Sequence, residues 1–237
     1  MNRKIYSQTR WIVTASEQLR RECLSRFGGD LSPRVRALYP PVDNPALSGA
    51  FSANGKGVPG KRLGVLARLD PKKGHGDILK AFAIVQKKYP DAELHIAGSE
   101  ENLSWSELFA RANAMGLKNC VYHGFLSREE VWNFTAECSA GVIGSLGSEE
   151  VSRALEEWMS QGRPVVATAV RSIPEILEDG KGGYLVPPGR PEEMAGKLCR
   201  ILEDEKLRER MARHNFESCR GRFSRDVFNT GWKEILA

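Results

Sequence analysis

The stretch SLGSEEVSRALEEWMSQGRPVVAT, residues 145–168, decides the fold. It follows an apolar run, SAGVIGS (139–145), which is typical of a buried strand, and it ends on a second apolar run, PVVAT (164–168). Between the two runs the apolar positions recur at helical spacing, at Val151, Leu155, Trp158 and Met159. A strand followed by a helix and another strand is the repeating unit of a parallel α/β sheet.

The same alternation continues along most of the chain. The apolar runs predict six strands, at 63–67, 93–98, 120–124, 139–145, 164–168 and 183–187. Ser127 followed by Glu130 forms a capping box, which predicts the start of a helix. We therefore predict an α/β fold: a doubly wound, parallel, Rossmann-like sheet followed by three consecutive helices after Pro191.

The N-terminal residues do not fit into that sheet. WIVTA (11–15), a helix from about Ser16 to Phe27, and VRALYP (35–40) predict a strand–helix–strand unit with too few strands to form a sheet of its own. It resembles the last piece of a second lobe. We divide the chain into a lobe remnant with a hinge, a flexible linker rich in Gly, Pro, Asn and Ser, a main domain and a C-terminal helix, at 1–42, 43–60, 61–220 and 221–237.

Composition limits the classes of function. The chain has 237 residues, 41% of them hydrophobic and 27% charged, and a net charge of +5. This mild charge suits an anionic ligand, or weak contact with an anionic membrane surface, better than a dedicated nucleic-acid binder. Residues 1–10 lack the apolar core of a signal peptide, and no apolar run approaches the ~18 residues of a membrane span. The five scattered cysteines indicate reduced thiols, so we expect a cytoplasmic protein, at most peripheral to the inner face of the membrane.

Two glutamates, Glu149 and Glu157, flank the start of the helix in the opening stretch. In parallel α/β sheets, ligands bind where strands end and helices begin, so we expect both carboxylates to face one crevice. The helix N-terminus between them favours phosphate, and eight helical residues would span about 12 Å. This order suits a sugar–diphosphate–nucleoside. The alternative is that the helix dipole alone accounts for glutamates in a first turn.

The segment GVLARLDPKKGHGD (64–77) follows the first strand of the main sheet and carries two cations, Arg68 and Lys73. Cations on one strand-end loop can converge on a diphosphate, and Gly74 and Gly76 would let the backbone approach closely. The alternative is a basic solvated loop. Neither the P-loop pattern nor the dinucleotide fingerprint occurs in the chain.

Other catalytic arrangements lack support in the sequence. No cluster of residues suggests a metal site, and among the histidines only His75 lies near the predicted crevice. His95 and His123 lie in predicted strands, where they indicate core or edge residues. Three serines, Ser145, Ser148 and Ser152, have no placed histidine partner, so a hydrolase triad is unsupported.

Taken together, these segments resemble the C-terminal, donor-binding half of a GT-B-fold retaining glycosyltransferase of the group 1 family. Five blocks in order carry the resemblance: ALYPPVD (37–43), GVLARLDPKKG (64–74), HIAGSEE (95–101), VYHGFLSREEV (121–131) and EEWMSQGRPVVATAVRSIPEIL (156–177). The resemblance implies transfer of a sugar from a nucleotide-sugar to a glycan or lipid-linked acceptor with retention of configuration. It also implies that no cofactor or metal is needed and that the C-terminal helix crosses toward a second lobe.

The resemblance also assigns roles to residues. Arg68 and Lys73 would hold the diphosphate, and Glu149, which completes the catalytic set, would contact the donor sugar. Glu157 would bind the ribose hydroxyls. The remaining donor contacts would come from Gly74, from the backbone near Phe125 and Leu126 for the base, and from the amides of Val151, Ser152 and Arg153 for phosphate or sugar.

Two departures from the family pattern qualify these roles. After the first glutamate the family has a Gly-aromatic-Gly run, whereas this chain has Glu150-Val151-Ser152, which makes Glu150 a rival to Glu149. The acceptor-binding lobe is missing, so we expect the isolated chain to be inactive and to self-associate through residues 1–40. Two alternatives remain: a non-catalytic nucleotide-binding or scaffold module, and a same-fold sugar-nucleotide epimerase or glycan phosphorylase, although the chain lacks an obvious cofactor-lysine motif for a phosphorylase.

Overall fold

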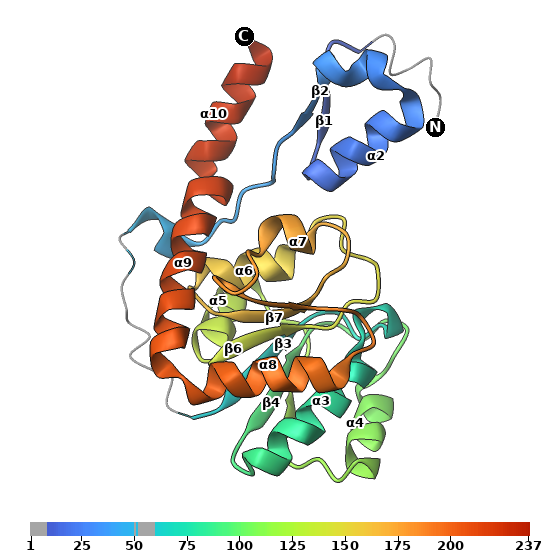
Figure 1. Cartoon of the computed structure of the whole chain (residues 1–237), viewed down its shortest axis with the longest axis vertical. Coiled ribbons are helices and arrows are strands. Elements are labelled where there is room, and N and C mark those ends of the chain that lie inside the picture. Colours follow the sequence, from blue (N-terminus) through green and yellow to red (C-terminus); the bar gives the residue numbers. More distant parts are fainter. Residues whose placement is uncertain (1–8, 50, 52–59) are drawn as a thin grey trace.

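The computed structural model describes residues 9–49, 51 and 60–237. Its largest element is a six-stranded sheet in which every strand is parallel to its neighbours (Figure 1). The six strands are β3 (Arg62–Leu66), β4 (Glu93–Ala97), β5 (Cys120–Tyr122), β6 (Ala140–Ile143), β7 (Val165–Thr168) and β8 (Gly183–Val186). All six predicted strands are thereby confirmed; β3 begins one residue before its apolar run, and the other five are shorter than theirs.

The strand order contains one reversal. Across the sheet the order is β5-β4-β3-β6-β7-β8, so the chain builds outward from β3 to β5, returns to place β6 beside β3, and then builds outward to β8. At the reversal, Leu63 pairs with Ala140 and Gly64 with Gly141. The crossover helices on the two sides of such a point lie on opposite faces, which leaves a crevice at the carboxyl ends of the two central strands.

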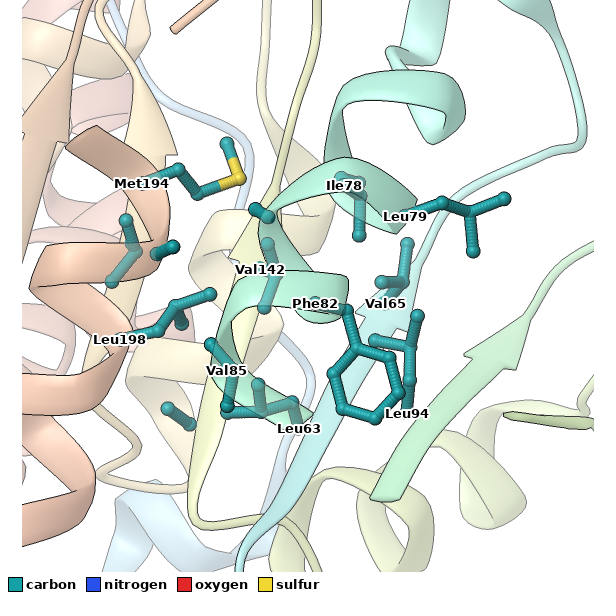
Figure 2. Packing of buried hydrophobic residues seen from close by; sticks show 14 of the residues in the cluster. Leu63, Val65, Ile78, Leu79, Phe82, Val85, Leu94, Val142, Met194 and Leu198 are labelled. Carbon is teal, nitrogen blue, oxygen red and sulfur yellow. The ribbon is translucent and has the colours of Figure 1, made fainter. Parts of the chain in front are cut away.

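Helices cover both faces of the sheet, as the doubly wound prediction requires. One face packs against α3 (His75–Lys88), α4 (Trp105–Ala114) and α8 (Pro191–Glu203). Figure 2 shows this core, where Phe82 and Val85 of α3 and Leu198 of α8 meet Leu63 and Val142 of the sheet. The other face packs against α5 (Arg128–Ala136), α6 (Arg153–Ser160), α7 (Ile173–Ile176) and the second half of α9 (Glu205–Phe223).

Trp158 fixes α6 against the two central strands. Its side chain is fully buried, and it lies over two strand residues that have no side chain, Gly64 of β3 and Gly141 of β6. A Cβ atom on Gly64 would lie 2.4 Å from the indole, and one on Gly141 would lie 2.5 Å from it, both closer than real Cβ contacts. The glycines therefore make room for the indole, which places the N-terminus of α6 beside the strand-order reversal.

The N-terminal strand–helix–strand unit is confirmed. It consists of β1 (Ile12–Thr14), α2 (Glu17–Phe27), a 3₁₀ helix (Gly29–Arg34) and β2 (Val35–Ala37), with β1 and β2 parallel. A small core of Phe27, Leu31 and Val35 holds it together. Figure 1 shows the unit beyond α7, joined to the main domain by the hinge.

The three C-terminal helices are also confirmed, as α8, α9 and α10 (Arg225–Leu236). The last of them runs up beside the hinge in Figure 1. A Cβ atom on Gly231 of α10 would lie 2.6 Å from the Leu38 side chain, so helix and hinge pack closely. The division of the chain at 42, 60 and 220 remains a prediction.

The first residues of the predicted linker contact the main domain, and the linker over 43–60 remains a prediction. Val42 donates its amide to the carbonyl of Phe223 at 2.8 Å, and the Asn44 side chain donates to the Ser160 hydroxyl at 2.8 Å. Leu47, in a short 3₁₀ helix (Pro45–Ser48), is buried against the core between the sheet and α5, α6, α7 and α9. The glycines and prolines of this segment are typical of a loop, so the sequence did not indicate these contacts. Residues 50 and 52–59 of the predicted linker lie outside the described residues.

The structure also bears on the expectations drawn from composition. Within the described ranges, no helix is both long and apolar enough to cross a bilayer. All five cysteines are free thiols. Residues 1–8 belong to the segment in which the sequence predicts no signal peptide. They lie outside the part of the chain that the structure describes.

Candidate functional site

A cavity of about 200 Å³ lies at the carboxyl ends of β3 and β6, at the reversal of strand order. Its walls come from the two strand ends, the loop after β3 and the start of α6. The lining residues that carry chemistry are Arg68, Lys73, Ser145, Glu149, Val151 and Arg153. The sheet therefore brings together the two cations and the first glutamate that the sequence predicted as one site.

The loop after β3 is built to turn back toward β6. Asp70 caps a 3₁₀ turn (Pro71–Lys73) by accepting the amide of Lys72 at 2.8 Å, and it accepts a second hydrogen bond from the Asn102 side chain at 2.7 Å. Gly74 then takes the left-handed conformation, with φ +69°, and a Cβ atom there would lie 1.9 Å from the carbonyl oxygen of Gly144. Only glycine fits this approach of the loop to the end of β6.

The sequence also singled out Gly76 and His75 in this segment, and the structure gives the two residues different roles. A Cβ atom on Gly76, in the first turn of α3, would meet open space, so no protein contact requires glycine there, and its close approach to a ligand remains a prediction. His75 is buried, and burial lowers its pKa. The ring is therefore neutral near pH 7, and its Nε2–H donates to the carbonyl of Arg68 at 2.8 Å. His75 holds the backbone of the loop and does not line the cavity.

Each of the two cations is paired with a carboxylate. The Nζ of Lys73 lies 2.6 Å from Oε1 of Glu149, which also accepts a hydrogen bond from the Ser145 hydroxyl. Arg68 is more exposed and forms an ion pair with Glu101. Glu149 is buried and Lys73 is only partly exposed, whereas both members of the Arg68–Glu101 pair lie near the surface. Arg68 can therefore turn toward a ligand more freely than Lys73.

The segment between the two glutamates is a loop as far as Ser152, because α6 begins at Arg153. The expected span of eight helical residues between Glu149 and Glu157 is therefore wrong. Ser152 makes no capping hydrogen bond with its side chain, and its buried hydroxyl has no partner among the described residues. The N-terminus of α6 thus keeps its partial positive charge beside the cavity.

The Arg153 side chain links the cavity to the hinge. Its guanidinium donates to the carbonyl of Pro41 at 3.1 Å and to the carboxylate of Glu156 at 2.7 Å. Glu156 has no exposed surface, and burial raises its pKa to about 7 in spite of this partner. Glu157 does not line the cavity. It is half-buried one turn beyond Arg153, and burial raises its pKa as well.

The residues expected near a base lie at the same edge of the sheet but outside the cavity wall. They follow β5, where the carbonyl of Gly124 accepts the amide of Gly98 at 2.8 Å. The Phe125 side chain is 79% exposed. Leu126 is half-buried and packs against the core between the sheet and α5, α6, α7 and α9, so Phe125 is the more accessible of the two.

A larger cavity, of about 600 Å³, lies elsewhere. Its lining includes Arg163, Arg210 and Arg213, and Arg163 stands two residues before β7, at the amino end of that strand. Ligands of open α/β sheets bind at the carboxyl ends, so the smaller cavity is the better candidate despite its size.

Sequence reasoning missed two serines that shape the site. The Ser145 hydroxyl holds Glu149, and Ser172 donates both its amide, at 3.0 Å, and its hydroxyl, at 2.7 Å, to the carbonyl of Glu149. Ser145 directly follows a buried strand, so the rule that pointed to Arg68 could have found it. Ser172 gave no such signal, because its contact depends on how two loops pack.

Comparison with known proteins agrees with this geometry. The family described as "Glycosyl transferases group 1" matches residues 50–217. The chain belongs to this family. It is 34% identical over 150 residues to an alpha-D-kanosaminyltransferase of Streptomyces kanamyceticus, covering 62% of this chain and 38% of that protein. It is 32% identical over 185 residues to a phosphatidyl-myo-inositol mannosyltransferase of Mycobacterium leprae, covering 76% of this chain and 47% of that protein.

The fold is shared with solved structures at lower identity. The crystal structure of Anabaena HepE in complex with UDP matches with a TM-score of 0.81 at 22% identity, covering 96% of this chain and 64% of that one. A Staphylococcus aureus TarM structure in complex with Fondaparinux, alpha-GlcNAc-glycerol and UDP matches with a TM-score of 0.83 at 19% identity, covering 99% of this chain and 45% of that one. The chain thus spans less than half the length of its two sequence relatives.

Proposed function

We propose that the chain is the donor-binding half of a glycosyltransferase and holds the diphosphate of a nucleotide-sugar in the cavity between β3 and β6. One observation carries the proposal: Arg68, Lys73 and the N-terminus of α6 meet around one cavity at the strand-order reversal. Each of the three favours negative charge, and together they match the charge of a diphosphate.

The two cations act on the leaving group. Arg68 turns from Glu101, and Lys73 shares its charge between Glu149 and the diphosphate. Their positive charge neutralises the bound donor and stabilises the nucleoside diphosphate as it departs. Because the chain's own cations supply this charge, binding needs no metal.

The remaining contacts follow the order of the donor. The amides of Val151, Ser152 and Arg153 contact phosphate or sugar, and Glu157 binds the ribose. Exposed Phe125, with the backbone at Leu126, meets the base. Glu149 contacts the donor sugar: it lines the cavity and is buried, whereas its rival Glu150 is exposed and pairs with Arg171.

The acceptor is a glycan or a lipid-linked acceptor bound by a second lobe, and transfer retains the anomeric configuration. Sequence relatives named for kanosaminyl and phosphatidyl-inositol mannosyl transfer support a glycosyl transfer without fixing donor or acceptor. An active site built from two lobes does not turn over with one. The rival function is a non-catalytic nucleotide-binding module, and donor turnover after addition of the missing lobe separates the two.

The proposal also assigns the N-terminal unit a role, as the surface through which the chain contacts another chain. A cavity of about 450 Å³, lined by Ile12, Val13 and Leu19 among others, opens on β1 and α2. Among the described residues the sheet there has two strands, β1 and β2, and exposed strand edges tend to recruit another chain, which supports self-association through this unit. The free cysteines support a cytoplasmic protein, and the charge of +5 supports weak contact with an anionic membrane surface.

Calorimetry with UDP, GDP and ADP tests the proposed function, each with and without EDTA. We expect one diphosphate to bind, with an affinity that EDTA leaves unchanged. Binding that EDTA abolishes would contradict the role given to Arg68 and Lys73. No binding by any of the three would favour a scaffold that has lost the site.

A further inference from the structure

Arg171 has an unusual backbone. It stands just after β7, at φ +51°, in the left-handed region that residues with a Cβ rarely adopt. Such a conformation persists only where the surrounding structure holds it, and residues of this kind cluster at functional sites.

The side chain of Arg171 spans two parts of the molecule. Its guanidinium forms a two-pronged ion pair with Glu22 of α2, with contacts of 2.7 and 3.1 Å, and it donates to the Glu150 carboxylate at 3.4 Å. Paired contacts of this kind fix orientation as well as distance. Arg171 therefore connects the N-terminal unit with the loop that carries both candidate sugar-binding glutamates.

The backbone of the same loop is held from the same two parts. Ser172, which follows Arg171, donates its amide and hydroxyl to the carbonyl of Glu149. Ser16, the N-cap residue of α2, donates its hydroxyl to the carbonyl of Glu150 at 3.0 Å. The main chain at 149 and 150 is thus fixed by one serine of the main domain and one of the N-terminal unit.

We propose that Arg171 is a positioning residue that couples the N-terminal unit to the orientation of Glu149. The inference rests on the proposed function, because it assigns Glu149 to the donor sugar. Arg171 does not line the diphosphate cavity. Loss of the bridge therefore loosens the sugar contact and leaves the diphosphate contacts in place.

The variant Arg171→Gly suits the test, because glycine accepts φ +51° and only the side chain is lost. Calorimetry compares the diphosphate with the nucleotide-sugar of the base that the wild-type chain binds. We expect the diphosphate to bind within about twofold of wild type and the nucleotide-sugar to bind at least about fivefold more weakly, the lower end of coupling between linked sites. Arg21→Ala is the matched control: Arg21 is an exposed cation of the same helix as Glu22, and it pairs with Glu175 instead of the loop.

A double-mutant cycle with Glu22→Gln separates positioning from a general loss of structure. Glu22→Gln alone should weaken the nucleotide-sugar in the same selective way, and it should add nothing on the Arg171→Gly background. Arg171→Lys should restore part of the selectivity. Equal weakening of both ligands, or additive effects of the two changes, would overturn the proposal.

Hydrogen exchange distinguishes failure of this proposal from failure of the proposed function. In Arg171→Gly the amides of residues 147–152 should exchange faster than in wild type, while those of α8 and α9 should not change. If wild type binds no nucleotide, the proposed function fails, and Arg171 then has no sugar to position even if the loop loosens. Unchanged exchange in the loop overturns the bridge itself.

Discussion

Lys73 and the buried Glu149 form an ion pair, with Nζ 2.6 Å from Oε1, although they are 76 positions apart in the sequence. Lys73 ends the turn after β3, and Glu149 lies in the loop after β6. The two strands are neighbours only because the strand order reverses between them. The ion pair therefore depends on the strand order of the sheet, and it lies in the candidate site.

Breaking this pair should destabilise the chain. Lys73→Ala leaves Glu149 buried without its cation, and removal of one partner of a buried pair costs about 3 kcal/mol. Urea unfolding measures the change. Lys72→Ala is the control, because Lys72 is an exposed lysine of the same turn. Equal stability of the two variants would show that Glu149 finds another partner or is solvated.

Arg68 and its surface partner should have opposite effects on ligand binding. Arg68→Ala should weaken the diphosphate by about 1.5–3 kcal/mol, the usual contribution of a charge-assisted hydrogen bond. Glu101→Gln removes the carboxylate that competes for Arg68, so it should leave affinity unchanged or raise it. Calorimetry with the diphosphate measures both. A loss of affinity in Glu101→Gln similar to that in Arg68→Ala would mean that the pair acts as one structural unit.

Substitutions of Glu157 and Glu149 should differ in which ligand they weaken. Glu157→Ala should weaken the diphosphate and the nucleotide-sugar equally, because the ribose is common to both. Glu149→Gln keeps an acceptor for Ser145 but loses the charge, and it should weaken only the nucleotide-sugar. If Glu150→Ala produces the sugar-selective loss instead, the register of the site is one residue further along.

Glu156 should make stability depend on pH. Burial raises its pKa to about 7 from 4.5, so between these values the folded chain keeps a proton that the unfolded chain has lost. Its contribution is present below pH 4.5 and is lost as pH rises through 7, a change of roughly 3 kcal/mol. Urea unfolding of wild type and Glu156→Gln from pH 4.5 to 8 measures it. His75, His95 and His123, whose pKa values burial lowers, affect both proteins alike. Parallel curves would contradict the prediction.

Self-association should depend on the groove of the N-terminal unit. Val13→Lys places a charge among the apolar residues that line it, so the variant should sediment as a smaller species than wild type. Analytical ultracentrifugation at matched concentrations makes the comparison. A wild-type chain that is already monomeric would show that this unit does not recruit a second copy.

Much of the fold followed from local sequence patterns. Six apolar runs gave six strands, and the capping box at Ser127 and Glu130 gave α5, because these signals lie within a few residues of each other. The packing of Leu47 did not follow, since its partners are far away in the chain and its neighbours are typical of a loop.

The site was predictable to the same extent. Arg68, Lys73 and Glu149 stand at strand ends, and the sheet brings such ends together. The helix start was correctly expected between the two glutamates, but the helical span from Glu149 to Glu157 was wrong, because α6 begins only at Arg153. The contacts of Arg171 and Ser172 depend on how two loops and α2 pack, and no local pattern encodes that.

The position of a bound diphosphate tests the central claim most directly. A crystal structure of the chain with the nucleoside diphosphate that binds best should show phosphate oxygens about 3 Å from Arg68, Lys73 and an amide of residues 151–153. The basic cavity near Arg163, Arg210 and Arg213 should hold none. A diphosphate bound in that second cavity, with the one between β3 and β6 empty, would contradict the account.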